Sequence, residues 1–265
     1  MLAPPPPRAA VLRRALARAG QAGWALWGRG MGFHTKADGT PVTAADLAAE
    51  AEIVTALRAD FPGDAIVTEE SGGQRGPGAW WAVDPIDGTS SFIEGLGHWG
   101  PTVARVVPDS GGPRVDCGAL LLPRLDEYYY VETGSGAGGW FNGERLAPLG
   151  SRESCRTVYL PSRFHAYFNL AYAGKTRCIG GTAAHLALVA RGAAEGVIVA
   201  PGWSLLDTAA GLALIAVLGG RAASLRTGEP LDPFSHEGEP FVAGTPGVVE
   251  ALLRPGAVSL REQDP

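Results

Sequence analysis

Two aspartates three positions apart, Asp84 and Asp87, end the apolar stretch that begins at Trp80 in the sequence WWAVDPIDGTSSF. Carboxylates at a strand end can point at one spot, and a backbone carbonyl between them can join them there. Such oxygen atoms are the ligands that hard cations such as Mg²⁺ require. A helix that begins at Thr89 would direct free N–H groups and its positive dipole end towards an anion such as a phosphate. The stretch therefore predicts a site for a cation and a phosphate.

The same stretch is also compatible with an ordinary turn. Asp-Pro and Asp-Gly pairs are common turn signals. Asp87 or Thr89 could cap a helix that starts at Ser90. The rest of the chain must decide between a turn and a cation site.

Four further acidic residues stand where they could join this pair. They end a β-rich run or open a predicted helix, and they are Glu69, Glu70, Asp46 and Asp207. Each has a structural explanation as well. Acidic residues are favoured near helix N-termini, Ser204 with Asp207 fits a capping box, and a glutamate at a strand end can simply be solvated.

The order of five short segments resembles the inositol monophosphatase family of Mg²⁺-dependent, lithium-sensitive phosphomonoesterases. The segments are VTAAD, TEES, DPIDGTSSF, GTAAH and LLDTAAG, and the resemblance spans about residues 36 to 245. Together these motifs are specific enough to favour the cation site over the turn. KADGTPVT, WAVDPIDGTSSFIEG and Trp99 are similar to histidinol-phosphatase-type members of the family.

The resemblance implies a role for each matching residue. The ligands of two or three Mg²⁺ ions would be Glu70, Asp84, the carbonyl of Ile86, Asp87 and Asp207. The catalytic set would be Asp46, Glu70, Asp87 and Thr89, in which Glu70 and Thr89 orient the attacking water. Asp46 would support Thr89 and a third, weaker metal. The phosphate would be held by Gly88, Thr89 and Ser90.

The predicted substrate pocket departs from both types of relative. Leu206 stands where family members commonly have tryptophan, and Ala200 stands where inositol phosphatases have a glutamate that contacts a substrate hydroxyl. Losing that charged partner would cost about 1.5–3 kcal/mol of binding. The segment GGTAAH is nevertheless closer to the inositol type. Candidate pocket residues, each of which could also be a packing or surface residue, are Trp99, Arg177, Thr182, His185 and Trp203.

These residues predict a phosphoric monoester hydrolase that uses a metal-activated water. Its expected substrate is a small phosphorylated alcohol, with histidinol phosphate, a cyclitol phosphate or a sugar phosphate as candidates. Two alternatives stay open. One is a 3′-phosphonucleotide phosphatase, for which no base-binding pocket can be identified, and the other is a catalytically quiet protein that binds a phosphorylated metabolite.

Composition limits the class of protein. Of the 265 residues, 46% are apolar, which fits a globular protein, and the net charge is −5. There is no basic run that would indicate nucleic-acid binding, and no apolar run of about 18 residues that would cross a membrane. The three cysteines form no CxxC pair, which favours reduced thiols in a cytoplasm over a zinc site or disulfides.

The elements that must position these residues change character near the middle of the chain. The first half reads as α+β, with helices over about 9–27 and 45–60 followed by antiparallel strands. The second half alternates strands and helices as an α/β protein does, with one helix near 163–173. We expect an N-terminal lobe (1–150) and a C-terminal lobe (151–265) that act as one functional domain. The resemblance implies a layered α-β-α-β-α sandwich and a homodimer.

Overall fold

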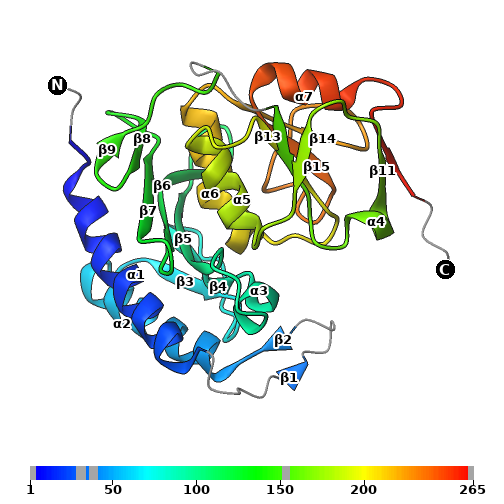
Figure 1. The fold of residues 1–265 in the computed structure, drawn as a ribbon. Helices are drawn as coiled ribbons and strands as arrows, with labels where there is room; N and C mark the ends of the chain where they lie inside the picture. Colours follow the sequence, from blue (N-terminus) through cyan, green and yellow to red (C-terminus); the bar gives the residue numbers. More distant parts are fainter. Residues whose placement is uncertain (1–3, 28–33, 36–40, 151–155, 262–265) are drawn as a thin grey trace.

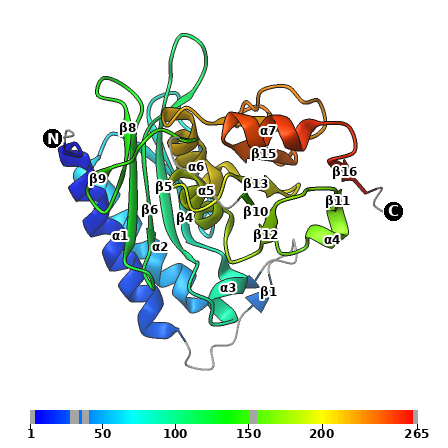
Figure 2. The ribbon, with the colours of Figure 1, turned by 45° about the horizontal axis from the view of Figure 1, so that its top comes forward.

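The computed structural model describes residues 4–27, 34–35, 41–150 and 156–261. Its elements stack in five layers, helix–sheet–helix–sheet–helix, as Figures 1 and 2 show. The α-helices are α1 (Pro7–Leu26), α2 (Ala44–Asp60), α3 (Thr89–Ile93), α4 (Phe164–Tyr167), α5 (Thr182–Ala190), α6 (Leu205–Val217) and α7 (Pro246–Leu253). The layered α-β-α-β-α sandwich that the resemblance implied is thereby confirmed.

The first sheet has seven strands in the order β3-β4-β5-β6-β7-β8-β9, and α1 and α2 pack together against one of its faces. Only β3 and β4 pair in parallel, and the other neighbours are antiparallel. The strands are β3 (Ala65–Thr68), β4 (Trp80–Asp87), β5 (Gly100–Val107), β6 (Arg114–Leu122), β7 (Glu127–Glu132), β8 (Gly138–Phe141) and β9 (Glu144–Arg145). A short pair, β1 (His34–Thr35) with β2 (Pro41–Val42), precedes α2.

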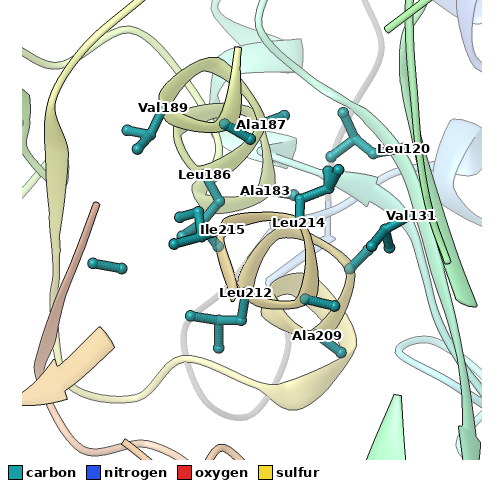
Figure 3. Packing of buried hydrophobic residues seen from close by; sticks show 14 of the residues in the cluster. Leu120, Val131, Ala183, Leu186, Ala187, Val189, Ala209, Leu212, Leu214 and Ile215 are labelled. Atoms are coloured by element: carbon teal, nitrogen blue, oxygen red, sulfur yellow. The ribbon is translucent and has the colours of Figure 1, made fainter. Parts of the chain in front are cut away.

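Helices α5 and α6 fill the middle layer between the two sheets. Both are apolar on almost every side, as a helix enclosed by protein must be. Figure 3 shows Leu214 of α6 facing Leu120 and Val131 of the seven-stranded sheet, while Leu186 of α5 meets Ile215 of α6. Because this layer is closely packed, the N-terminal ends of α5 and α6 are held in fixed positions.

The second sheet has five strands in the order β12-β10-β13-β15-β14, with α7 against β14 and β15. β10 pairs in parallel with β12 and β13, whereas β15 is antiparallel to β13 and β14. The strands are β10 (Thr157–Tyr159), β12 (Lys175–Arg177), β13 (Gly196–Val199), β14 (Arg221–Ser224) and β15 (Phe241–Gly244). Along the chain, β9 is the last strand of the first sheet and β10 is the first strand of the second. The division into two lobes at 150 stays a prediction.

The prediction of a helix near 163–173 is wrong. Only one turn forms there, α4, and the chain then continues as strand β11 (Phe168–Leu170), which pairs with β16 (Val258–Leu260). Phe168 is buried and Asn169 is exposed, which is the alternation of a strand. The pairing partner lies about 90 residues away in the sequence, so tertiary contact overrides the local helical pattern.

Within the described ranges, none of the helices combines the length and the apolar composition needed to cross a membrane.

Candidate active site

A cavity of about 410 Å³ opens where the end of β4 meets the N-terminal ends of α5 and α6. Four carboxylates line it, and they are Glu69, Asp84, Asp87 and Asp207. The neutral part of the lining includes Ile86, Gly88, Thr89, Ser90, Thr182 and His185. Segments that are far apart in the sequence therefore bring most of the predicted site residues to one place.

A β-bulge at the end of β4 lets both of its aspartates reach the cavity. Asp84 pairs with Thr102 of β5 and Asp87 pairs with Gly100, so β4 has one extra residue between these pairs. In a regular strand, residues three apart point to opposite faces. Pro85, which has no N–H to donate, lies inside this bulge, as proline in a sheet commonly does. The Oδ1 atom of Asp84 accepts the N–H of Ile86 at 2.9 Å, which fixes the carboxylate.

Asp87 faces the N-terminus of α5. Its Oδ1 accepts the N–H of Thr182 at 3.1 Å, and its Oδ2 accepts the N–H groups of Ala183 and Ala184 at 2.9 and 3.4 Å. A carboxylate here satisfies N–H groups that have no partner within the helix and meets the positive end of the helix dipole. Asp87 therefore connects the first sheet to the middle layer.

The approach of Asp87 to α5 requires a glycine at position 181. A Cβ atom on Gly181 would lie 2.0 Å from Asp87 Oδ2, whereas its φ of −68° is one that alanine adopts easily. We expect Gly181→Ala to displace the carboxylate and to lower kcat/KM by roughly 10²-fold, as small misplacements of catalytic groups can. Phosphate release would measure this. Gly63→Ala, where a Cβ meets nothing within 4 Å, is the control. Full activity of Gly181→Ala would contradict the assignment of Asp87.

The turn from β4 into α3 presents Thr89 to Asp46. Gly88 adopts a left-handed conformation (φ 87°), and a Cβ there would lie 3.0 Å from the backbone nitrogen of Gly181. The hydroxyl of Thr89 lies 3.2 Å from both Asp46 Oδ1 and the carbonyl oxygen of Ile86. Asp46 is fully buried, and burial raises its pKa although hydrogen bonds from Thr43 and Thr89 oppose the shift.

Helix α2 positions Asp46 through its N-terminal cap. Thr43 donates its backbone N–H (2.8 Å) and its hydroxyl (2.6 Å) to Asp46 Oδ2. This reciprocal capping box fixes the carboxylate while leaving Oδ1 directed at Thr89. Asp46 thus serves the helix and the site together.

Asp207 lies in the first turn of α6. Ser204 caps this helix by accepting the N–H of Leu206 at 3.1 Å. The Oδ1 atom of Asp207 is buried and has no hydrogen-bond partner among the described residues. A buried carboxylate oxygen without a partner is costly, so this atom fits a cation ligand.

Burial and mutual repulsion dominate the electrostatics of the cavity. Burial, followed by the charge of Glu69, raises the pKa of Asp84 well above its usual value. Burial raises the pKa of Asp87 to about 7, although the N–H groups of α5 oppose the shift. Burial and the charges of Asp87 and Glu69 raise the pKa of Asp207 as well. Such a set needs protons or cations to neutralise it.

The donor set is that of a hard divalent cation, since it consists of carboxylates and one carbonyl. In the described parts of the chain, no three His, Cys, Asp or Glu side chains are already gathered closely enough to hold an ion. The residues nevertheless fit such a cation, because one cavity is lined by Glu69, Asp84, Asp87 and Asp207, and Oδ1 of Asp207 has no hydrogen-bond partner among the described residues.

One predicted ligand is displaced by a single position. Glu69, not Glu70, lines the cavity. The pairing of Thr68 with Val83 continues as the N–H of Glu69 donates to the Val83 carbonyl, which places Glu69 beside Asp84. The N–H of the next residue, Glu70, donates to Glu50 Oε2 instead. β3 ends at Thr68 and the chain turns directly after it, so the two adjacent glutamates have different surroundings and Glu69 is the one that lines the cavity.

Three of the candidates for the substrate pocket lie elsewhere. Arg177 is exposed at the end of β12, and its Nη1 donates to the carbonyl of Thr176. Trp99 is fully buried with its ring edge-on to Phe92, and Trp203 donates to a backbone carbonyl. These side chains have structural roles and do not line the cavity.

His185 lines the cavity as a neutral side chain. Its Nε2 accepts the N–H of Ile179 at 3.2 Å, and its ring stacks on Tyr159 with centroids 4.9 Å apart. Burial, assisted by the charge of His98, lowers its pKa to about 3. The lining residues that the sequence analysis did not single out, Pro161, Ser162 and Val199, come from a neighbouring strand and loop with no motif to mark them.

Comparisons with known proteins identify the family. The model of the inositol monophosphatase family matches residues 7–258. The histidinol-phosphatase of Mycobacterium tuberculosis is 33% identical over 206 residues, which is 73% of this chain and 77% of that protein. The IMPase structure from Thermotoga maritima has a TM-score of 0.79 and 25% identity, covering 93% of this chain and 95% of that one.

One further relative matches over a shorter stretch. The glucose-1-phosphate thymidylyltransferase of Streptomyces griseus is 36% identical over 141 residues. The aligned stretch covers about half the length of that protein (51%) and about half of this chain (52%). Its name therefore carries no conclusion about the activity of this chain.

The fold and the acidic cavity define a phosphoric monoester hydrolase, a class supported by the family match. The chain belongs to the inositol monophosphatase family. Members of this family are generally metal-dependent and act on small phosphate esters.

Proposed function

We propose that this protein is a Mg²⁺-dependent phosphomonoesterase that hydrolyses a small phosphorylated alcohol. The observation that carries the proposal is the buried, unpartnered Oδ1 of Asp207, which belongs to the same cavity as Asp84 and Asp87. Without a cation, burial and the neighbouring like charges destabilise carboxylates that are placed in this way.

The cation ligands in this proposal are Glu69, Asp84, the carbonyl of Ile86, Asp87 and Asp207. When bound, two or three Mg²⁺ ions would neutralise these charges, lower the pKa of an attacking water and stabilise the leaving oxygen. The chain itself does the positioning. Asp46 accepts the hydroxyl proton of Thr89, so the lone pairs of Thr89 stay available to orient that water.

The phosphate would lie at the start of α3. Gly88 is left-handed there, so its backbone and those of Thr89 and Ser90 approach the cavity without a side chain in the way. The N–H groups and hydroxyls of these residues would hold the phosphate oxygens.

The neutral lining favours an uncharged leaving group. Pro161, Ser162, Val199 and Leu206 carry no charge, and His185 is neutral because its pKa is near 3. A cavity of about 410 Å³ is within the range of small-molecule sites. We favour a cyclitol or sugar phosphate over a 3′-phosphonucleotide, because the described residues of the lining include no Phe, Tyr or Trp ring on which a base could stack. Histidinol phosphate stays a candidate through the relative from M. tuberculosis. The proposal includes a cytoplasmic homodimer.

Phosphate release from a panel of esters tests the proposal. We expect turnover with Mg²⁺, its loss in EDTA and its return with excess Mg²⁺. The panel is inositol 1-phosphate, a hexose phosphate, histidinol phosphate, AMP and adenosine 3′,5′-bisphosphate. Turnover that EDTA leaves unchanged would contradict the metal mechanism. Mg²⁺ binding without turnover of any ester would support the quiet binding protein instead.

A further inference from the structure

Glu237 lies outside the cavity, between β14 and β15, yet its side chain joins two segments that carry the acidic residues. Its Oε1 accepts the backbone N–H of Leu205 at 2.7 Å and lies 3.3 Å from the hydroxyl of Ser204. Its Oε2 lies 2.9 Å from Nη2 of Arg75. One carboxylate therefore contacts both the first turn of α6 and the loop 71–78.

The contact with α6 fixes the turn that presents Asp207. Glu237 and Ser204 accept the N–H groups of Leu205 and Leu206, which have no partners within the helix. A charged acceptor at a helix N-terminus is especially favourable. Burial opposes ionisation, but these hydrogen bonds and Arg75 lower the pKa of Glu237, so it is charged at neutral pH. Because Oδ1 of Asp207 has no partner of its own, its position depends on this turn.

The contact with Arg75 fixes the loop that follows Glu69. At its start the loop is held by Ser71, whose backbone and hydroxyl contact Glu50. Near its middle, the guanidinium of Arg75 lies 5.1 Å from the ring centroid of Trp80 and pairs with Glu237. An exposed ion pair of this kind contributes little to stability. The hydrogen bond to Leu205 should therefore dominate the effect of Glu237.

We propose that Glu237 is a positioning residue for the cation site, which holds Asp207 and the segment after Glu69 at the spacing that cation binding needs. The inference rests on the proposed metal centre. It assigns to Glu237 no contact with substrate. Two contacts of one carboxylate, one with the first turn of α6 and one with the loop that follows Glu69, carry it.

Mg²⁺ binding measured by calorimetry without substrate tests this role. Glu237→Ala removes both contacts, and we expect the Kd for Mg²⁺ to rise about tenfold, as for other residues that orient ligands. Glu237→Gln keeps an acceptor for Leu205 but loses the charge. Arg75→Ala loses the ion pair and the contact with Trp80 but keeps the hydrogen bond from Leu205 to Glu237, so each variant should raise Kd about threefold. Glu250→Gln, an exposed glutamate on α7, is the matched control and should leave Kd unchanged.

Trypsin provides a second readout, because it cleaves after Arg75. We expect Glu237→Gln to be cleaved there several-fold faster than the wild type, while the Glu250→Gln control is cleaved at the wild-type rate. A merely structural role would lower Tm without changing Kd or this cleavage.

Three results would overturn the proposal. The first is a folded Glu237→Ala variant whose Kd for Mg²⁺ is within twofold of the control. The second applies if Glu237→Ala fails to fold, and it is a Glu237→Gln variant with wild-type Kd for Mg²⁺ and wild-type trypsin cleavage. A wild type that binds no Mg²⁺ would overturn the proposed metal centre and this inference with it, whereas binding that is equal in all variants overturns this inference alone.

Discussion

Asp87→Asn is expected to lower kcat/KM by about 10³-fold or more, which corresponds to ~4 kcal/mol of transition-state stabilisation. Asp87 is the aspartate that both lines the cavity and receives three N–H groups from α5. An amide has the same shape but no negative charge, so it would bind a cation weakly. Its NH₂ group would also face an N–H group of α5 in either orientation, because both oxygens of Asp87 accept such groups.

Phosphate release at saturating Mg²⁺ would measure this effect, alongside calorimetric binding of Mg²⁺. Asp60→Asn is the matched control, since Asp60 is exposed at the end of α2 and its substitution changes the charge by the same amount. Equal thermal stability of the two variants would show that the loss is catalytic. Turnover by Asp87→Asn at the wild-type rate would exclude the mechanism proposed here.

Asp207→Asn is expected to make the metal-free protein more stable while it weakens Mg²⁺ binding. Burial and the charges of Asp87 and Glu69 raise the pKa of Asp207 in the folded state. At neutral pH without metal, the folded protein must therefore either hold a proton on Asp207 or carry a charge that burial disfavours. Replacing the carboxylate by a neutral amide removes this cost and should increase the free energy of unfolding by roughly 2 kcal/mol, the scale of an unsatisfied buried group.

The free energy of unfolding of the metal-free wild type should depend on pH through Asp207. Above the ordinary aspartate pKa near 4 and below the raised folded value, the folded chain holds more protons than the unfolded chain. Stability of the metal-free wild type therefore falls through this window as pH rises, by up to ~1.4 kcal/mol per pH unit for this group. The variant lacks this loss, so its advantage should widen with pH.

Urea denaturation in EDTA at pH 5 and pH 7.5 would measure the difference between variant and wild type. Comparing the two proteins cancels the opposite contribution of His185, whose lowered pKa makes stability rise with pH over part of this range. Asp60→Asn should show no such difference. A variant that is less stable than the wild type at pH 7.5 would mean that Asp207 has a favourable partner in the metal-free protein.

Much of the site could be predicted from local sequence, because its residues lie at the ends of helices and strands whose starts and stops the sequence marks clearly. The apolar run before Asp84 marked a strand, and the glycine after Asp87 marked the turn that follows. The segment VTAAD and the pair Ser204 and Asp207 marked the starts of α2 and α6. The aspartates at these helix starts could be named because a helix cap and an acidic first turn depend on residues that are close together in the sequence.

Other features depended on which segments meet. The choice between Glu69 and Glu70 followed from the parallel register of β3 on β4. Register is set by packing between segments, so the sequence analysis named Glu70 where the structure turns Glu69 to the cavity. The assignment of Arg177 and Trp99 to the substrate pocket failed for the same reason. The type of a side chain does not show whether it points to the cavity, to the core or to solvent.

The sequence by itself therefore determined the acids, the helix starts that carry them and the kind of chemistry they perform. The tertiary structure decided the spacing. It alone brought α5 to Asp87, turned Glu69 towards Asp84 and placed Glu237 against the start of α6. The reason is physical: caps and turns arise from contacts within a few residues, whereas these contacts arise only when the middle helices are packed between two sheets.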